Sequence, residues 1–469
     1  MKIISDLHIH SRFSRACSKD LTIPNLEKYA RIKGINLLGT SDFTHPEWIK
    51  ELKKELSEDG TGVLKTKTNF NFILSSEISL MYTDLGKGRR VHNVIFAPNF
   101  EVVEQITEAL KKRGRVDYDG RPIFKITCPE FVEMMHSISK DIEIIPAHAW
   151  TPYFGIFGSM SGFDSLKDAF QDKVKEIHAI ETGLSSDPPM NWRLKELDGI
   201  NLVSFSDSHS YWPWRLGREA TVFEFKGTNN EDNVNEENIE ESLKKLSFEK
   251  VIDAFRTGDN LWGTIEVDPN YGKYHFDGHR DCGISYHPSE TKTHNGFCPV
   301  CKKPLTIGVM NRVEQLADKD RPEGFKLKNA KEFKSLIPLS ELISFVLHKS
   351  ISTKPVFEEH YNLLKHFGNE YNILLNVSED ELIKATNKQL ANLIIKNRNA
   401  ELKFIAGYDG VYGKIVMDGK EYSEDETNID KTNIGNKPTK KLKEEKNQNE
   451  KPAGKLVKQK HVQKGLMDF

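Results

Sequence analysis

The sequence contains few cysteines and no long apolar run. Its 469 residues include five cysteines, Cys17, Cys128, Cys282, Cys298 and Cys301. Five thiols at such uneven spacing exclude a disulfide framework, and the clustering of three of them indicates a metal site in an intracellular protein. No stretch approaches the roughly 18 apolar residues of a membrane span, and the N-terminus runs into a predicted strand without a signal-peptide pattern. We therefore expect a cytoplasmic protein.

Neither sign of charge dominates the composition. The chain has 67 basic and 69 acidic residues, a formal net charge of −2, 37% hydrophobic residues and 29% charged residues. These values are typical of a soluble globular protein, and the length leaves room for more than one domain. A near-neutral net charge does not exclude a nucleic-acid partner, because binding depends on local basic patches.

Seven short apolar runs recur in the first half of the chain, and metal-binding or acidic residues accompany them. The runs cover residues 3–10, 37–42, 72–77, 91–96, 142–148, 177–181 and 202–209. Such runs, separated by helix-length segments, are typical of buried parallel strands joined by crossover helices. In barrels of this kind the carboxyl ends of the strands converge on one face. We therefore expect ligands that are far apart in sequence to meet in space.

The segments between the runs carry helix signals. Pro24, Pro46 and Pro129 stand where a first helical turn begins, and Gly34 stands where one ends. The predicted helices cover residues 23–34, 46–56, 101–112, 129–139, 163–171, 190–197 and 247–258. This α/β pattern predicts a (β/α) barrel over residues 1–265, with a polar loop or insertion at 226–242.

The remaining chain changes character twice. Residues 266–325 contain the cysteine cluster and show no helical periodicity. Residues 326–420 are predicted to be mainly helical, because apolar residues lie three and four apart at 336–343 and 381–395. Residues 407–414 are punctuated by glycine and predict a turn-rich loop. Residues 421–469 are rich in Lys, Glu, Asn and Gln and predict a disordered basic tail, because such a composition buries too little apolar surface to fold.

The predicted strands carry a set of candidate metal ligands. His8 and His10 lie two apart on a strand, so both rings project to one face and can bind one ion. Alone, such a pair is a weak indication, because either histidine can be a core or surface residue. The pattern gains weight from further metal-binding side chains at predicted strand ends, namely Asp42, Glu77, His92, His148, Asp207 and His209.

With their neighbours, these residues resemble the polymerase and histidinol phosphatase (PHP) superfamily of metal-dependent phosphoesterases. The resemblance implies a distorted (β/α)7 barrel that holds two or three Zn, Mn or Mg ions. It implies one site formed by His8, His10, Glu77 and Asp207, a second formed by Glu77, His92 and His148, and a third formed by His209 with Asp42 or a neighbour.

The sequence departs from the superfamily at one string. The usual Thr-Asp-His reads here Ser41-Asp42-Phe43-Thr44-His45, so the histidine is displaced by two residues. The third ion and its ligands therefore stay open. Cys17 lies near the position of a further superfamily ligand, and the choice between a ligand and a small core residue stays open as well.

The expected chemistry follows from the ions. Clustered divalent cations lower the pKa of water from 15.7 to roughly 7 and stabilise charge on the attacking and leaving oxygens of a phosphoester. We expect Glu77 to bridge ions, and Asp207 to bind one ion and orient the nucleophile. These two are the predicted catalytic residues.

The cysteine cluster predicts a structural zinc site. Cys298 and Cys301 form a Cys-x2-Cys knuckle, and Cys282 precedes it by sixteen residues. A tetrahedral site needs a fourth ligand. Our choice is His287, which gives Cys-x4-His followed by Cys-x2-Cys, and His279 and His294 are the alternatives.

The barrel and this module together resemble the endonuclease Q family. The similar strings lie at residues 271–275, 277–280, 298–301, 312–318 and 407–413, and the resemblance covers roughly residues 1–414. It implies an enzyme that nicks DNA 5′ to uracil, hypoxanthine, xanthine and abasic sites. Members of the family often carry four zinc-binding cysteines, and Ser285 stands here where a further cysteine could complete a second Cys-x2-Cys.

Two segments beside the predicted metals are candidates for DNA contact. An enzyme that inspects a damaged base usually extrudes it from the stack. Glu181 and Ser185 could read the edge of such a base, and the alternative is that they cap their own loop. Trp212 could wedge or stack bases, and Arg215 or Arg218 could hold phosphate. The alternative for the aromatic ring is a place in the core.

The last residues suggest a protein partner. Residues 431–469 hold eleven lysines against four acidic residues, and most of this stretch is expected to be a solvated linker. Gln463, Leu466 and Phe469 resemble the motif that binds the sliding clamp, proliferating cell nuclear antigen (PCNA). A monomeric DNA repair endonuclease tethered to the clamp is thus the leading hypothesis. A small-molecule PHP phosphoesterase and an inactive metal-bearing scaffold are the alternatives.

Overall fold

The computed structural model describes residues 2–225, 243, 245–417 and 420–423. The predicted insertion at 226–242 lies outside these residues. Most of the predicted tail also lies outside them, and with it the clamp-binding candidates Gln463, Leu466 and Phe469. Among the described helices, none is long and apolar enough to cross a membrane.

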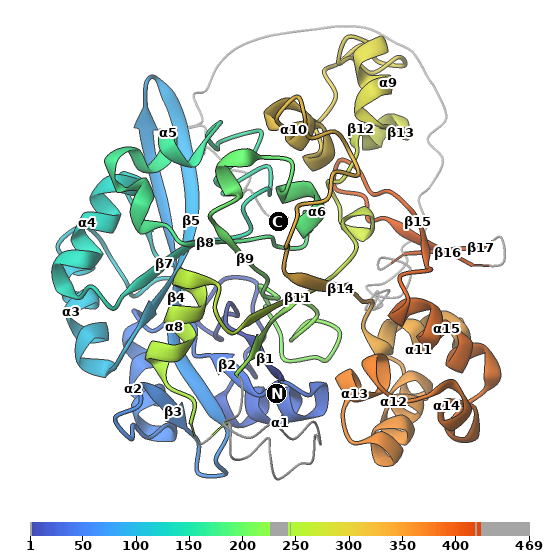
Figure 1. The fold of residues 1–469 in the computed structure, drawn as a ribbon, viewed down its shortest axis with the longest axis horizontal. Helices are drawn as coiled ribbons and strands as arrows, with labels where there is room; N and C mark the ends of the chain where they lie inside the picture. The colour runs from blue at the N-terminus through green and yellow to red at the C-terminus, as the bar shows by residue number, and fades with distance from the viewer. Residues whose placement is uncertain (1, 226–242, 244, 418–419, 424–469) are drawn as a thin grey trace, which may run out of the picture. The chain divides into compact units, whose positions relative to one another are not determined.

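All seven predicted runs contain strands. They are β1 (Lys2–Asp6), β2 (Leu37–Gly39), β4 (Asn71–Asp84), β5 (Lys87–Ala97), β7 (Glu143–Pro146), β8 (Ala179–Glu181) and β9 (Asn201–Val203). The main sheet has the order β14-β11-β10-β1-β2-β4-β5-β7, and β8 pairs with β9 separately. It includes β10 (Ala220–Glu224), β11 (Leu261–Glu266) and β14 (Glu332–Ser335), while β3 (Val63–Lys65) and β6 (Ile123–Phe124) pair with β4. The sheet curls into the expected α/β barrel-like fold (Figure 1).

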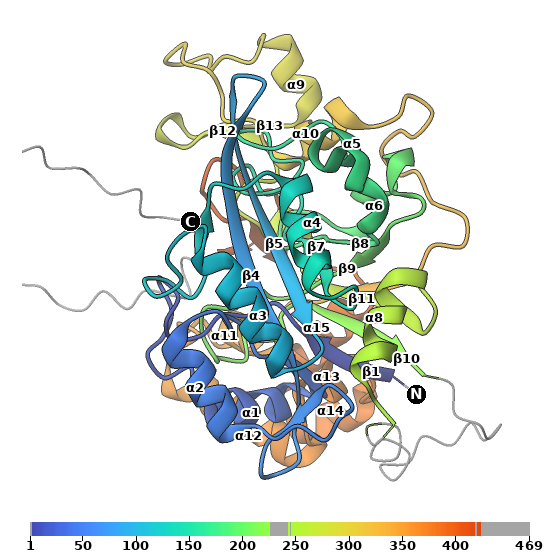
Figure 2. The same cartoon turned by 90° about the vertical axis from the view of Figure 1, so that its left-hand side faces the viewer.

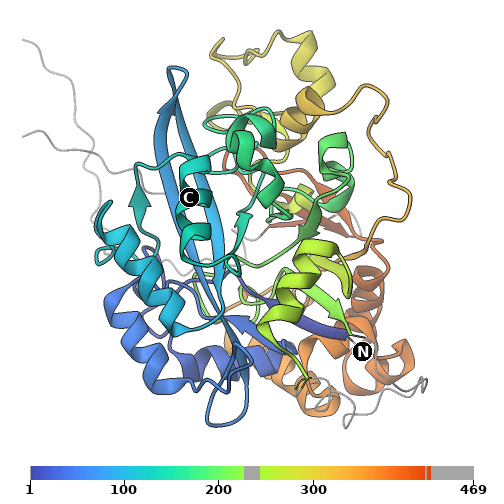
Figure 3. The same cartoon turned by 60° about the vertical axis from the view of Figure 1, so that its left-hand side comes forward.

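The strands are not all parallel, which corrects one sequence expectation. β1, β2 and β4 are parallel, but β5 runs antiparallel to β4 and to β7, and β10 runs antiparallel to β1. The reason is the turn between β4 and β5, where only Leu85 and Gly86 connect the strands, with φ of 47° and 77°. A two-residue turn with positive φ at both positions produces a hairpin. The hairpin extends past the neighbouring strands (Figure 3).

The predicted barrel helices form where the capping signals stand. α1 (Ile23–Lys33), α2 (Pro46–Glu55) and α4 (Cys128–Ile138) begin with proline in the first turn, and Gly34 ends α1 in the left-handed conformation. α3 (Phe100–Lys111) and α8 (Phe248–Thr257) also match their predicted ranges within two residues. α3 and α4 pack together along one side of the sheet (Figure 2).

Two predicted helices are shorter than expected. Within 163–171 the structure has α5 (Leu166–Phe170), and the positive φ of 51° at Gln171 ends it before the 3-10 helix η1 (Gln171–Glu176). Around 190–197 it has α6 (Pro188–Asn191), which Asp187 caps and which begins two residues before the predicted range, followed by η2 (Lys195–Leu197). Local capping thus divided segments whose apolar spacing alone suggested longer helices.

The chain after the barrel forms a small mixed segment and then a group of helices. The first contains η3 (Pro269–Tyr271), β12 (Asp277–His279), η4 (Arg280–Cys282), β13 (Ile284–Tyr286), α9 (Pro288–Thr293) and α10 (Val309–Leu316). The second contains α11 (Leu339–Leu347), α12 (Lys354–Phe367), α13 (Glu370–Leu375), α14 (Glu379–Ala385) and α15 (Lys388–Arg398). The helical apolar pattern at 381–395 is divided between α14 and α15, because Asn387 caps a new helix there.

Not all of the predicted helical region is helical. β14 pairs in parallel with β11 and so extends the barrel sheet. Residues 403–423 form a three-stranded sheet of β15 (Lys403–Ile405), β16 (Lys414–Met417) and β17 (Lys420–Ser423). The last of these strands lies at the start of the predicted tail.

A buried ion pair ties the helical group to the barrel. Lys33 Nζ lies 2.6 Å from Glu370 Oε1 and donates to the carbonyl oxygen of Pro213 at 2.8 Å. The Tyr371 hydroxyl donates to the carbonyl oxygen of Gly217 at 2.5 Å. Both acceptors belong to the segment that follows the candidate ligands Asp207 and His209, so the helices brace the backbone beside the site.

Candidate metal centre

The structure brings the residues of the first two predicted metal sites together. His8, His10, Glu77 and Asp207 each offer a ligand atom within 4.8 Å of the others, and so do Glu77, His92 and His148. Glu77 belongs to both groups. Its Oε1 atom lies 2.5 Å from His92 Nδ1 and 3.1 Å from His148 Nε2, and its Oε2 atom lies 3.3 Å from His10 Nε2.

Strand geometry explains how two of these residues meet. Ser79 pairs with His92 across β4 and β5, and Glu77 lies two residues before Ser79, on the same face. Glu77 and His92 are therefore diagonal neighbours within a hairpin. Both residues lie in mid-strand, whereas the sequence had placed them at strand ends.

The other ligand candidates follow strands at sharp turns. His148 has φ of 30° and Asp207 has φ of 47°, conformations that are uncommon for residues other than glycine. The backbone N–H of His10 donates to the carbonyl oxygen of Ser208 at 2.9 Å, which joins the segments after β1 and β9. Strained backbone of this kind concentrates at functional sites.

Three of the histidines have a polar partner at Nδ1. His8 Nδ1 lies 3.0 Å from both carboxylate oxygens of Glu181, and His148 Nδ1 lies 2.9 Å from the Thr151 hydroxyl. His10 Nδ1 lies 3.3 Å from Asp42 Oδ1. Such partners fix the ring orientation and direct the opposite nitrogen toward a metal.

The unpaired inner nitrogen of His8 shows that the donor set fits a cation. His8 Nε2 is buried and has no hydrogen-bond partner, although buried polar atoms normally have one. It faces Glu77 Oε2 at 3.6 Å and Asp207 Oδ1 at 3.7 Å. Imidazole and carboxylate donors suit Zn and Mn, and carboxylates also suit Mg.

The carboxylates at the centre stay ionised despite their burial. Burial alone would raise the pKa of Glu77, but electrostatic interactions with His92, Arg121 and His8 hold it well below its usual value. Burial also acts on Asp207, and the hydrogen bond from His10 together with the neighbouring histidines keeps its pKa well below the usual range. Both groups therefore remain acceptors and ligands at neutral pH.

The predicted third site, His209 with Asp42 or a neighbour, is not among the candidate groups of three or more ligands in the described residues. Asp42 Oδ1 contacts His10, and Asp42 Oδ2 accepts hydrogen bonds from the Ser11 backbone N–H at 2.7 Å, the Ser11 hydroxyl at 2.6 Å and the Ser14 hydroxyl at 2.8 Å. These bonds use the carboxylate to orient the loop and His10. His209 Nδ1 lies 3.0 Å from the carbonyl oxygen of Asp207, and among the described residues it joins no candidate metal group.

His45 and Cys17 also lie outside both groups. His45 precedes α2 as its N-cap residue, and its ring stacks on Phe13 with the ring centroids 4.4 Å apart. Cys17 is partly buried, and burial raises the pKa of its thiol. The displaced histidine thus packs against an aromatic side chain instead of turning toward the metals.

The structure gives Glu181 a role other than the predicted one. Its side chain is fully buried, and its carboxylate contacts His8 and accepts the backbone N–H of His148 at 2.7 Å. In this structure its carboxylate therefore faces the histidines. Ser185 is partly buried in the loop after β8, where it stays a candidate for base contact.

The structure places Trp212 in a group of aromatic rings, and its contact with a base stays a prediction. Its ring stacks on Trp214 with centroids 5.1 Å apart and planes at 4°, and it contacts Phe357 of α12 at 5.6 Å. Trp212 is thus a partly buried member of an aromatic cluster between the barrel and the helices. Arg215, which is partly buried, follows this cluster.

Sequence reasoning missed Arg121. Its Nη1 atom lies 3.2 Å from Glu77 Oε2, and its side chain is 24% exposed. No sequence signal pointed to it, because it stands in an irregular stretch between α3 and β6 and belongs to no recognisable motif. Only the folded chain brings this arginine to the shared carboxylate.

A second candidate site lies in the cysteine cluster, and its fourth member is His279. The ligand atoms of His279, Cys282, Cys298 and Cys301 lie within 4.8 Å of one another. His287 was the predicted fourth ligand, but it precedes Pro288 and caps α9, where its Nδ1 accepts the Ser289 backbone N–H. The β12–β13 pairing places His279 beside the turn that holds Cys282.

The Cys298 thiol of this cluster suits a zinc ion. Desolvation opposes ionisation of Cys298, but the backbone N–H groups of Cys301 and Val300 outweigh it and lower the pKa of this thiol to about 7. A knuckle that stabilises a thiolate in this way is typical of structural zinc sites. The Cys3His set is therefore complete in donor number and type.

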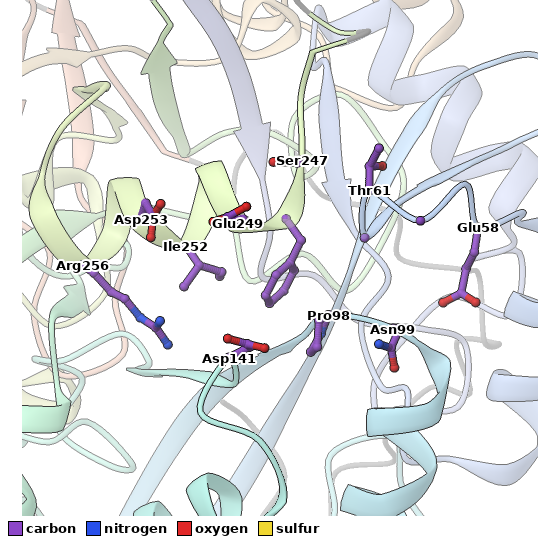
Figure 4. A pocket seen from close by; sticks show the side chains of 13 residues that line it. Glu58, Thr61, Pro98, Asn99, Asp141, Ser247, Glu249, Ile252, Asp253 and Arg256 are labelled. Carbon is purple, nitrogen blue, oxygen red and sulfur yellow. The ribbon is translucent and has the colours of Figure 1, made fainter.

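One hollow of the described surface lies away from the candidate metal residues. A cavity of about 670 Å³ opens beside α8 and the start of α3 (Figure 4). Its lining includes Glu58, Asp141, Glu249, Asp253 and Arg256, and none of the candidate metal residues. We assign it no role, because its acidic residues alone identify no ligand.

Comparisons with known proteins identify several relatives. Residues 338–401, which span α11 to α15, match the family model described as the MJ0043 C-terminal domain. The chain is 32% identical over 294 residues to the uncharacterized protein MJ0043 of Methanocaldococcus jannaschii, and this match spans 61% of the chain and a third (33%) of MJ0043. It is 28% identical to the uncharacterized protein YqxK of Bacillus subtilis, over 88% of the chain and 99% of YqxK.

Two solved structures are similar over most of the chain. One is the lesion-specific endonuclease PfuEndoQ of Pyrococcus furiosus, with 32% identity, a TM-score of 0.74, and coverage of 89% of this chain and 96% of PfuEndoQ. The other is endonuclease Q in complex with a 27-mer duplex that carries an abasic lesion at the active site. It has 32% identity, a TM-score of 0.73, and coverage of 92% of this chain and 100% of that one.

Proposed function

This chain belongs to the endonuclease Q family, and we propose that it is a metal-dependent DNA repair endonuclease that cuts on the 5′ side of deaminated bases and abasic sites. The expected deaminated bases are uracil, hypoxanthine and xanthine. One relative is a lesion-specific endonuclease, and another holds a duplex with an abasic lesion at its active site. The observation that carries the proposal is the pair of donor groups that share Glu77.

The donor groups suit catalysis by two cations, Mg or Mn, with Zn as the alternative. When bound, divalent cations in such a cluster lower the pKa of water and stabilise charge on phosphoryl oxygens. In hydrolysis the water oxygen bonds to phosphorus, the bond from phosphorus to the leaving oxygen breaks, and a proton from water ends on that oxygen. His8, His10, His92 and His148 would hold the ions together with Glu77.

Asp207 is the residue best suited to orient the water. Its side chain is 30% exposed, whereas that of Glu77 is fully buried, so Asp207 faces the mouth of the centre. Its lowered pKa keeps it a carboxylate that can accept a hydrogen bond from the nucleophile. Loss of this carboxylate is expected to stop turnover without unfolding the barrel.

The modules after the barrel are proposed to hold the duplex. The Cys3His cluster fits a structural zinc ion, and the helices α11 to α15 are bound to the barrel beside the segment that follows the ligands. Extrusion of the damaged base costs a few kcal/mol, and less where pairing is already weak. Ser185, Trp212 and Arg215 are candidates for contact with the extruded nucleotide.

Recruitment by the sliding clamp is also a proposal. Gln463, Leu466 and Phe469 have the spacing of a PCNA-binding motif at the end of a lysine-rich stretch. We propose that a monomer of this protein binds the clamp through these three residues. Loss of binding to PCNA on deletion of residues 463–469, with nicking of free oligonucleotides retained, would support it.

The function is tested with labelled duplexes that carry one deoxyuridine, deoxyinosine or abasic site, in Mg or Mn. The proposal expects a nick in each damaged duplex and none in an undamaged duplex of the same sequence. An intact damaged duplex, together with cleavage of small phosphate esters such as histidinol phosphate, would instead identify a small-molecule phosphoesterase.

A further inference from the structure

Backbone hydrogen bonds hold the segment that contains Arg121 beside the candidate metal centre on two sides. The backbone N–H of Gly120 donates to the carbonyl oxygen of Phe13 at 3.1 Å. On the other side, the backbone N–H of Ser79 on β4 donates to the carbonyl oxygen of Pro122 at 3.1 Å. Asp119 accepts the backbone N–H of Arg121 at 3.1 Å. The backbone of Arg121 is thus fixed between the loop after β1 and the strand of Glu77.

Gly120 allows this close approach. A Cβ atom at Gly120 would lie 2.3 Å from Asp42 Oδ2 and 2.4 Å from the Ser14 hydroxyl, both too short for a side chain. The backbone therefore passes directly against the carboxylate that holds His10. This contact determines where the next residue projects its side chain.

The guanidinium of Arg121 reaches the shared carboxylate and remains accessible. Its Nη1 atom lies 3.2 Å from Glu77 Oε2. Glu77 is the hydrogen-bonding partner observed for this side chain in the part of the chain that the structure describes. With 24% of the side chain exposed, further N–H groups of its fork can reach an anion at the mouth of the centre.

We propose that Arg121 is a catalytic residue that binds a non-bridging oxygen of the scissile phosphate and stabilises the charge that develops there during hydrolysis. The inference rests on the proposed endonuclease function and adds to it a phosphate-binding group outside the predicted ligand set. An arginine is always charged and its planar fork matches phosphate oxygens. Its place beside Glu77 puts that charge next to both donor groups.

Within the described ranges, the donor groups of three or more ligands beside this centre are the two that share Glu77, and Arg121 adds a further positive charge there. Asp42 is bonded to the loop and to His10, and His45 stacks on Phe13, so neither contributes to a further candidate metal group among the described residues. A fixed guanidinium can supply positive charge to the phosphate without a metal ion. In other phosphoryl-transfer enzymes such an arginine accelerates the reaction by about 10³–10⁵-fold.

The competing explanation is that Arg121 only positions Glu77. The two explanations differ in what a substitution changes. A group that only positions Glu77 alters metal affinity, and saturating metal restores the rate. A group that binds phosphate alters the chemical step at full metal occupancy.

The test compares Arg121→Gln and Arg121→Lys with Arg115→Gln, which removes an exposed arginine of the same segment. We expect Arg121→Gln to lower kcat on a lesion duplex about 10²–10³-fold, and Arg121→Lys to recover part of the loss. Mn affinity, measured by titration, and duplex affinity without added Mg or Mn should change less than threefold. Arg115→Gln should cut like the unmodified protein. Recovery of the Arg121→Gln rate at high Mn would overturn the proposal.

A phosphorothioate substrate probes the contact itself and also serves if Arg121→Gln folds poorly. Sulfur replaces each non-bridging oxygen of the scissile phosphate in turn. We expect one diastereomer to be cut slowly by the unmodified protein, whether Mg or Mn is present, and this difference to disappear in Arg121→Lys. An unchanged sulfur effect in Arg121→Lys would contradict the proposal. If the unmodified protein cuts no damaged duplex, the proposed function fails, and the inference fails with it.

Discussion

Glu181 lies with both carboxylate oxygens 3.0 Å from Nδ1 of His8, and both side chains are buried. The contact orients the ring so that Nε2, which has no other partner, faces Glu77 and Asp207. A carboxylate behind a ligating histidine fixes its tautomer and raises its basicity. Glu181 is therefore a positioning residue for the metal centre.

Replacing Glu181 should weaken metal binding without disrupting the fold. Glu181→Gln is expected to reduce the affinity of the centre for Mn about 10- to 100-fold, because the ring of His8 loses its anionic partner. Isothermal titration of the metal-free protein measures this. Glu224→Gln, on the exposed end of β10, is the matched control. Equal Mn affinity in Glu181→Gln and in the control would contradict this role.

The four histidine and cysteine positions of the second cluster lead to a prediction about zinc. His279→Ala should release the zinc ion or lower its affinity, because His279 and the three cysteines have ligand atoms within 4.8 Å of one another. His287→Ala should keep the ion, since that ring caps α9. Zinc content per chain, measured by mass spectrometry, distinguishes the two. Loss of zinc in His287→Ala and not in His279→Ala would restore the assignment made from sequence.

A pair of buried carboxylates predicts how stability depends on pH. Glu266 is fully buried, and this burial raises its pKa to about 8, while the pKa of the neighbouring Glu219 is raised well above its usual value, chiefly by burial as well. In the unfolded chain Glu266 ionises near pH 4.3. Between that pH and about 8 the folded protein binds more protons, so this group makes the protein less stable as pH rises.

Glu266→Gln should therefore raise Tm, and the gain should be larger at pH 8 than at pH 5. The amide keeps an acceptor for the Thr182 and Ser204 hydroxyls, which both lie 3.0 Å from Glu266 Oε2. Thermal unfolding at the two pH values measures the difference, with the exposed Glu249→Gln as the control. A gain that is equal at pH 5 and pH 8 would show that Glu266 does not titrate in this range.

The buried ion pair between Lys33 and Glu370 predicts a stability effect of a different kind. Lys33→Met removes one charge and leaves Glu370 with His360 as its charged partner, 3.1 Å away. Breaking a buried pair in this way costs about 3–5 kcal/mol. Urea unfolding measures the loss, and Lys28→Met on the exposed side of α1 should change stability by less than about 0.5 kcal/mol. A small effect of Lys33→Met would show that the pair is not needed to brace the helices.

The sequence predicted those parts of the site that depend on local pattern. The alternation of His8 and His10 and the apolar runs before Asp207 and His148 follow strand periodicity, and the structure brings these residues together. The positions of the barrel helices follow from proline and glycine signals at their ends. The spacing of the three cysteines also predicted their part in the second cluster.

What the sequence could not predict depends on the fold around these residues. His279 and His287 both lie near Cys282 in sequence, and only the β12–β13 pairing and the cap of α9 separate a ligand candidate from a capping residue. From the sequence, Asp42 was a candidate ligand and Glu181 a candidate for base contact. In the structure each carboxylate contacts the Nδ1 atom of a histidine. Arg121 has no motif, and its contact with Glu77 joins residues 44 positions apart.

The most direct test of the central claim maps the cut made in a duplex with a single deoxyuridine in the presence of Mn, at single-nucleotide resolution, for the unmodified protein and for Asp207→Asn. The account predicts one nick immediately 5′ of the deoxyuridine, absent from the undamaged duplex and absent with Asp207→Asn. A nick of equal yield with Asp207→Asn would contradict the assigned metal centre, and cutting that ignores the lesion would contradict the repair function.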